Sequence, residues 1–122
     1  MKIFYGKVIK GEQIGEKQGF PTANLNPRLL AGRRLAKGVY IVTAFLESMK
    51  YPALLIYGVP GFKIQKNGKA EVYFLNYNGR IYGRTIGVQV HKKIRPLRFY
   101  SKKSALLKRI RQDIKITKNY FK

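Results

Sequence analysis

The fold is decided by residues 38–57, which read GVYIVTAFLESMKYPALLIY. The first part, residues 38–47, is rich in β-branched and aromatic side chains, which favour strands. The polar segment 47–50 predicts a turn, and residues 51–57 predict a second strand that returns beside the first. An antiparallel hairpin is therefore the expected centre of the fold.

Three more strands are expected around this hairpin. Residues 2–9 predict the first. Asn67-Gly68 and Asn78-Gly79 are strong turn signals, and residues 70–77 between them predict a strand. Residues 84–91 alternate, which predicts one apolar and one polar face. The apolar face holds Ile86, Val88 and Val90, and the polar face holds Thr85, Gln89 and His91. Several short strands joined by glycine turns indicate a mainly β protein, either a compact barrel or a sandwich.

The end of the chain changes to helical spacing. Leu106, Leu107, Ile110 and Ile114 recur at intervals that predict a helix over residues 102–115. Ser101 is the expected cap, because its hydroxyl can accept a hydrogen bond from a free amide. The opposite face carries Lys102, Lys103, Lys108, Arg109 and Arg111. A basic helix for RNA or membrane is the alternative, but the apolar stripe favours packing on the barrel.

The composition limits the kinds of protein that the chain can be. Its 122 residues fit one domain over residues 1–122, and the absence of Cys excludes disulfides and thiolate zinc sites. With 26 Lys and Arg against five acids, the net charge is +21. Such a surface attracts polyanions, although a merely solvated basic surface explains it equally well. No secretory signal or membrane span is recognisable, so we expect a cytoplasmic protein, with no membrane partner, that is a monomer.

The segment from residue 11 to residue 25 is the first candidate site. Its closely spaced glycines can let backbone amides approach phosphate oxygens. Thr22 and Asn24 are two residues apart, so in an extended chain their side chains lie on one side. A hydroxyl and a carboxamide suit Mg²⁺, which prefers hard oxygen ligands and is usually shared with substrate phosphates. The alternative is a turn whose backbone these two side chains satisfy.

Carboxylates and histidine are too scarce for most other chemistry. The sequence has no GxxxxGK[ST] phosphate loop and no protein-kinase motif, and a single histidine, His91, cannot form a histidine metal cluster. Glu71 opens an expected strand and could point into a half-buried pocket as a general base. By itself it is more readily explained as an ordinary acid of an edge strand.

Residues 19–25, GFPTANL, resemble the signature of riboflavin kinases, including the kinase half of bacterial bifunctional FAD synthetases. Further family motifs follow in order along nearly the whole chain. They are matched by Gly38-Val39-Tyr40, residues 71–77 (EVYFLNY), Tyr82-Gly83, Ile94-Arg95-Pro96, Phe99, Leu106, Ile110 and Asp113.

The resemblance implies a fold and an activity. It implies a small six-stranded Greek-key barrel with a C-terminal α-helix, which transfers the γ-phosphoryl group of Mg-nucleotide, ATP by default, to the 5′-hydroxyl of riboflavin and gives FMN. Because the barrel begins almost at Met1, we expect no adenylyltransferase domain. The alternatives are a basic β-barrel that binds RNA or single-stranded DNA, and a flavin-binding sensor without turnover.

The resemblance also assigns roles to residues. It makes Glu71 the catalytic base and a flavin contact, and Thr22 and Asn24 the Mg²⁺ ligands. The nucleotide would be bound by Gly15, Lys17, Gly19, Pro21, Thr22, Asn24 and Tyr73. The flavin would be bound by Glu71, Arg95, Leu97 and Phe99. The chain departs from the family pattern at Ile14, Gly61, Tyr73, Asn76 and Leu97, positions that concern nucleotide preference and flavin contacts.

Overall fold

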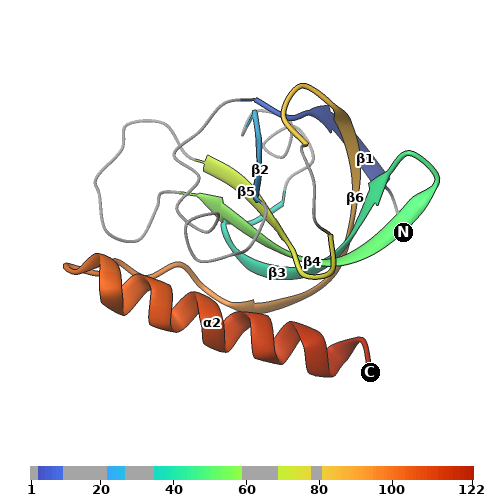
Figure 1. Ribbon diagram of the computed structural model, residues 1–122. Helices are drawn as coiled ribbons and strands as arrows, with labels where there is room; N and C mark the ends of the chain where they lie inside the picture. The colour runs from blue at the N-terminus through green and yellow to red at the C-terminus, as the bar shows by residue number, and fades with distance from the viewer. Residues whose placement is uncertain (1–2, 10–21, 27–34, 59–68, 78–80) are drawn as a thin grey trace.

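The structure is a computed structural model that describes residues 3–9, 22–26, 35–58, 69–77 and 81–122. Within these ranges six strands form one antiparallel sheet, and a helix follows it (Figure 1). The elements are β1 (Ile3–Lys7), β2 (Thr22–Leu25), β3 (Gly38–Leu46), β4 (Met49–Gly58), β5 (Lys69–Phe74), β6 (Thr85–Arg95) and α2 (Lys103–Tyr120). The predicted mainly β fold with a C-terminal helix is confirmed.

The strand order is β1-β6-β3-β4-β5-β2. In this order β3, β4 and β5 are successive antiparallel neighbours and β6 returns beside β3, which is the Greek-key arrangement. The sheet curls until its two edge strands approach each other (Figure 1). There the Ile9 amide donates a hydrogen bond of 2.7 Å to the Asn24 carbonyl, the one bridge between the two edges among the described residues. The sheet thus curls into a half-barrel whose two edges are joined at this seam by a single bridge.

Alternation along the strands produces two cores. On β5, the inward side chains Ala70, Val72 and Phe74 belong to the core inside the barrel. That core also takes the predicted apolar face of β6, with Ile86 and Val88 buried and Val90 packed against them. The second core lies between the outer face of the sheet and α2. It consists of Val39, Leu54, Tyr73, Leu106, Leu107, Ile110 and Ile114.

Some boundaries differ from those expected. The β3–β4 turn is only Glu47-Ser48, where Glu47 has a positive φ of 58°. The strand expected over residues 70–77 ends at Phe74, whereas β6 continues four residues past His91 to Arg95. The Asn67-Gly68 and Asn78-Gly79 turns lie outside the described residues. No helix in the described part of the chain is long and apolar enough to cross a membrane.

The helix corrects two expectations. Its cap is Lys102, without a side-chain hydrogen bond, so the predicted Ser101 cap is wrong. The helix also continues to Tyr120 instead of ending near residue 115. Buried Thr117 donates its hydroxyl to the Asp113 carbonyl at 2.8 Å, and the Tyr120 and Phe121 rings pack on His91. These contacts stabilise the additional turn, which sequence periodicity alone did not predict.

Candidate functional site

Strands β2 and β5 bring the candidate metal ligands next to the candidate base. Their antiparallel register sets Asn24 opposite Glu71 and Thr22 opposite Tyr73. The intervening Ala23 belongs to the core inside the barrel, so alternation turns these four polar side chains to the outer face. All four are buried, with exposed fractions between 2% and 6%. The segment that the sequence left without assigned secondary structure thus contains a strand that places Thr22 and Asn24 on one side.

Thr22 and Asn24 each have a polar atom that the rest of the described structure leaves unsatisfied. Thr22 Oγ1 and Asn24 Nδ2 are buried and find no hydrogen-bond partner among the described residues. Burial of such an atom without a partner costs about 1–3 kcal/mol. A ligand at this position would compensate for that cost, so the outer face of β2 is a candidate binding surface.

The donor set fits Mg²⁺ that is shared with a nucleotide. A threonine hydroxyl is a hard oxygen ligand, and a half-turn of the Asn24 amide exchanges its nitrogen for its oxygen. Within the described ranges no three His, Cys, Asp or Glu side chains form a metal-binding group. Thr22 and Asn24 would therefore supply only part of the coordination, and phosphate oxygens and water would supply the rest.

The Tyr73 hydroxyl is coupled to Glu71. Burial raises the pKa of Tyr73 well above its usual value of 10.0, and the neighbouring Glu71 raises it further through its charge and a hydrogen bond. The hydroxyl therefore stays protonated at neutral pH and donates a hydrogen bond to the Glu71 carboxylate. A donated hydrogen bond holds a carboxylate in one orientation, so Tyr73 positions the candidate base.

A buried ion-pair network joins the end of β6 to α2. Asp113 is fully buried and accepts hydrogen bonds of 3.0 and 3.1 Å from Arg95 Nε and one of 2.7 Å from Arg95 Nη2. Arg109 Nε lies 3.2 Å from Asp113 Oδ1, at ion-pair distance. The guanidinium of Arg95, a predicted flavin contact, is thus held by Asp113. Sequence reasoning assigned Asp113 no site role, although a carboxylate within an apolar helical stripe was a usable signal.

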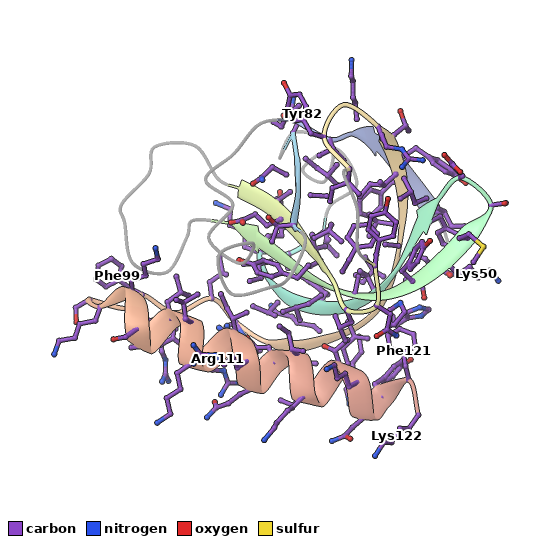
Figure 2. All side chains as sticks on the ribbon, in the orientation of Figure 1. Lys50, Tyr82, Phe99, Arg111, Phe121 and Lys122 are labelled. Atoms are coloured by element: carbon purple, nitrogen blue, oxygen red, sulfur yellow. The ribbon has the colours of Figure 1, made fainter. Side chains whose placement is uncertain are left out.

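The segment after Arg95 borders an open pocket of about 150 Å³. The pocket is lined by Arg95, Pro96, Leu97, Arg98, Tyr100 and Arg109. Leu97 is half-buried against the second core, and Phe99 is 59% exposed. Figure 2 shows Phe99 beside the start of α2. Gly58, at a φ of +131°, lets Leu97 pack against β4, since a Cβ there would overlap Leu97 Cδ1.

The remaining predicted site residues lie elsewhere. Gly15, Lys17, Gly19 and Pro21, predicted to bind the nucleotide, lie outside the described residues, as do Ile14 and Gly61. His91, expected on the polar face of its strand, is half-buried, and its Nε2 lies 2.6 Å from Thr43 Oγ1.

Comparison with known proteins gives a consistent result. The family model described as "Flavokinase: Riboflavin kinase" matches residues 2–121. A bifunctional riboflavin kinase/FMN adenylyltransferase of Buchnera aphidicola from Schizaphis graminum is 37% identical over 119 residues, which cover 95% of this chain and 38% of that protein. The RNA-binding riboflavin kinase RibR of Bacillus subtilis is 33% identical over 117 residues, or 93% of this chain and 49% of RibR. The chain thus spans less than half the length of these relatives.

Solved structures share the fold. A crystal structure described as a macrolide-efflux protein from Streptococcus pneumoniae has a TM-score of 0.75 and 26% identity, and covers 96% of this chain and 38% of that one. The riboflavin kinase of Trypanosoma brucei has a TM-score of 0.62 at 24% identity, and covers 97% and 78% of the two chains. At that identity, the second match supports the fold alone.

Proposed function

The chain belongs to the riboflavin kinase (flavokinase) family, and from this premise we propose that it transfers the γ-phosphoryl group of a Mg-nucleotide, ATP by family default, to riboflavin. The products are FMN and a nucleoside diphosphate. The observation that carries the proposal is the outer face of the β2–β5 ladder, where two candidate oxygen ligands lie beside one buried carboxylate.

The transfer requires positioning and charge neutralisation more than covalent work by the protein. Thr22 and Asn24 would hold Mg²⁺ and so orient the nucleotide phosphates. When bound, the ion offsets the negative charge of the phosphate oxygens. Glu71 accepts the proton of the riboflavin 5′-hydroxyl. The riboflavin 5′-oxygen bonds to the γ-phosphorus, and the bond between the γ-phosphorus and the β,γ-bridging oxygen breaks, which leaves the nucleoside diphosphate. Tyr73 keeps the Glu71 carboxylate oriented on the nucleotide side of the site.

The other assignments complete the proposal. Backbone N–H groups around Gly15 and Gly19 bind phosphate oxygens, Pro21, which has no N–H to donate, contacts the nucleotide through its ring, and Lys17 offsets the phosphate charge. Leu97 and Phe99 cover the isoalloxazine ring. Because the Arg95 guanidinium is paired with Asp113, Arg95 contributes to flavin binding by fixing the segment that carries these two side chains.

The decisive experiment is FMN formation from riboflavin and MgATP, followed by chromatography. Glu71→Gln keeps the size of the side chain but cannot accept a proton, so turnover falls by at least about 100-fold while riboflavin still binds. Glu47→Gln is the matched control, since Glu47 is an exposed acid on the β3–β4 turn, and it keeps wild-type turnover.

The outcome separates the proposal from its alternatives. Full turnover by Glu71→Gln would remove Glu71 as the base. Riboflavin binding by the wild-type protein without release of ADP, with other nucleotides and metals also tried, would identify a flavin sensor instead of a kinase.

A second candidate function is affinity for nucleic acid. The +21 charge favours it, and the RibR relative is described as RNA-binding. Such binding is compatible with kinase activity. The single domain over residues 1–122, the monomeric state and the cytoplasmic location remain part of the proposal, and sedimentation of the purified chain tests the monomer.

A further inference from the structure

The outer surface of α2 carries a row of cations. Lys108, Arg111, Lys115 and Lys118 are all exposed and follow one another at intervals of three, four and three residues. At 3.6 residues per turn, these positions fall within a sector of about 80° and extend for about 15 Å along the axis. We call these four residues the basic ridge. Side chains on the outer side of α2 extend away from the barrel, with Arg111 labelled among them (Figure 2).

Most of the exposed charge of the helix lies on this side, since the only other cations of α2 are Lys103, which is exposed, and Arg109, which is half-buried. The other exposed flank holds only uncharged side chains, and these are Ala105, Gln112, Ile116 and Asn119. The single acid of the helix, Asp113, is buried and paired with Arg95 and Arg109. The helix therefore presents no exposed carboxylate beside the ridge.

The rest of the described surface offers little negative charge either. Of the three carboxylates in the described ranges, Glu71 and Asp113 are buried. Glu47 is exposed, but it lies on the β3–β4 turn in an ion pair with Arg84. A surface with so few acids produces a positive field that draws a polyanion toward the protein, and the ridge is a continuous line along which one can lie.

We propose that the basic ridge binds the phosphate backbone of a single-stranded nucleic acid. The ridge extends for about 15 Å, and over that length one strand with a rise of about 3.4 Å per phosphate presents about four phosphates, enough for one per ridge cation. A single strand is flexible, so its phosphates can follow the ridge over its whole length. The backbone of a stiff duplex winds around the duplex axis, so fewer of its phosphates can contact the ridge. The inference rests on the nucleic-acid affinity proposed above and is independent of the kinase assignment.

A membrane surface fits the helix less well. A helix that lies in a bilayer interface inserts its apolar face among the acyl chains. In α2 that face is already occupied, because Leu106, Leu107, Ile110 and Ile114 pack on the outer face of the sheet, along which the helix runs in Figure 1. The ridge itself contains no apolar side chain, so it can offer a lipid surface only charge.

The test is the salt dependence of binding to a 12-nucleotide oligouridylate, measured by fluorescence anisotropy between 50 and 200 mM salt. Four phosphate contacts to a single strand predict a slope of log K against log salt of about −2.8, or an affinity loss of about 50-fold over this range. Lys108→Gln/Lys115→Gln removes two ridge contacts, so its slope falls to about −1.4 and its loss to about sevenfold.

The control is Lys7→Gln/Lys50→Gln, which removes the same charge from exposed positions on β1 and β4. It keeps the wild-type slope if the ridge is the binding surface. Both double variants keep the wild-type circular dichroism spectrum and FMN formation, since neither pair belongs to the site on β2 and β5. If the wild-type protein had no kinase activity, the proposed nucleic-acid binding by the ridge would be unaffected.

Four results would overturn the proposal. They are equal slopes for the ridge and control variants, no oligouridylate binding at 50 mM salt, tighter binding of a 12-base-pair duplex at equal phosphate concentration, and ridge-dependent binding to phosphatidylserine vesicles that exceeds binding to the oligonucleotide. A 12-nucleotide oligothymidylate that binds like the RNA supports recognition of the backbone alone.

Discussion

The Tyr73 hydroxyl links the candidate site to the pH dependence of folding. Its pKa is raised in the folded protein, first by burial and then by Glu71. A group whose pKa rises on folding contributes stability that is complete below its unfolded pKa, here about 10, and is lost as the pH rises toward the folded value. Tyr73 therefore stabilises the fold at neutral pH and makes it sensitive to alkali.

Tyr73→Phe removes this sensitivity. The free energy of unfolding of the wild-type protein declines above pH 10, and the Tyr73 contribution to that slope is at most about 1.4 kcal/mol per pH unit. The variant lacks this contribution, so its stability declines less steeply. Urea unfolding at several pH values between 8 and 11.5 measures the two slopes.

Tyr5→Phe is the control for this experiment, because Tyr5 is 58% exposed on β1. Its slope matches that of the wild-type protein. A Tyr73→Phe slope equal to both would show that the Tyr73 hydroxyl does not couple to folding.

At the level of elements, Asp113 joins β6 to α2. Its carboxylate is fully buried and bidentate to Arg95, which has a side-chain exposure of only 11%. Asp113→Asn leaves two guanidinium groups without a counter-charge, so we expect a loss of about 3–5 kcal/mol in the free energy of unfolding. Denaturant unfolding at pH 7 measures it.

The exposed pair of Glu47 and Arg84 provides the comparison for Asp113. Glu47→Gln removes the same kind of charge pair, but at a carboxylate that is 74% exposed, where the expected loss is about 1 kcal/mol or less. Similar losses in the two variants would mean that the Asp113 network contributes no more than a surface ion pair.

The sequence predicted the elements in which a repeating pattern carries the information. The alternation of Ile86, Val88 and Val90 on β6 and the apolar spacing of Leu106, Ile110 and Ile114 on α2 were sufficient, because burial acts on every second residue of a strand and on one face of a helix. Strand β2 was not predicted, because a segment of four residues between glycines and prolines is too short to show an alternating pattern. The helix end was missed because it depends on contacts of Tyr120 and Phe121 with distant His91.

The site was predictable only in part. The family motifs named Thr22, Asn24 and Glu71, and the β2–β5 register places all three on one buried face. The pairing of Arg95 with Asp113 could not be derived from spacing, because it joins residues 18 positions apart on different elements. Whether the named residues bind and react as assigned stays a prediction.

For the molecule as a whole, the barrel seam and the candidate metal site meet in one residue. The Asn24 carbonyl accepts the Ile9 amide across the seam, while its side chain lies on the outer face beside Glu71. A ligand that binds this side chain in the folded state only also stabilises the closed seam. Nucleotide binding should therefore be visible at Ile9.

We expect MgADP at about 100 times its dissociation constant to slow hydrogen exchange of the Ile9 amide by up to about 100-fold. Exchange measured by NMR with and without MgADP gives this ratio. The Phe121 amide, bonded to the Thr117 carbonyl at the end of α2, is the internal control and changes less. If saturating MgADP did not change the hydrogen-exchange rate of the Ile9 amide, nucleotide binding would not be coupled to the seam.

The scarcity of exposed acids on the described surface also governs how copies of the chain behave toward one another. Two molecules that carry +21 each repel at low ionic strength, which favours high solubility and opposes self-association. The same repulsion is screened within about 8 Å at physiological salt. In a crowded cell, the diffusion of such a protein is slowed chiefly by transient contacts with anionic macromolecules, so its mobility depends on which polyanions surround it.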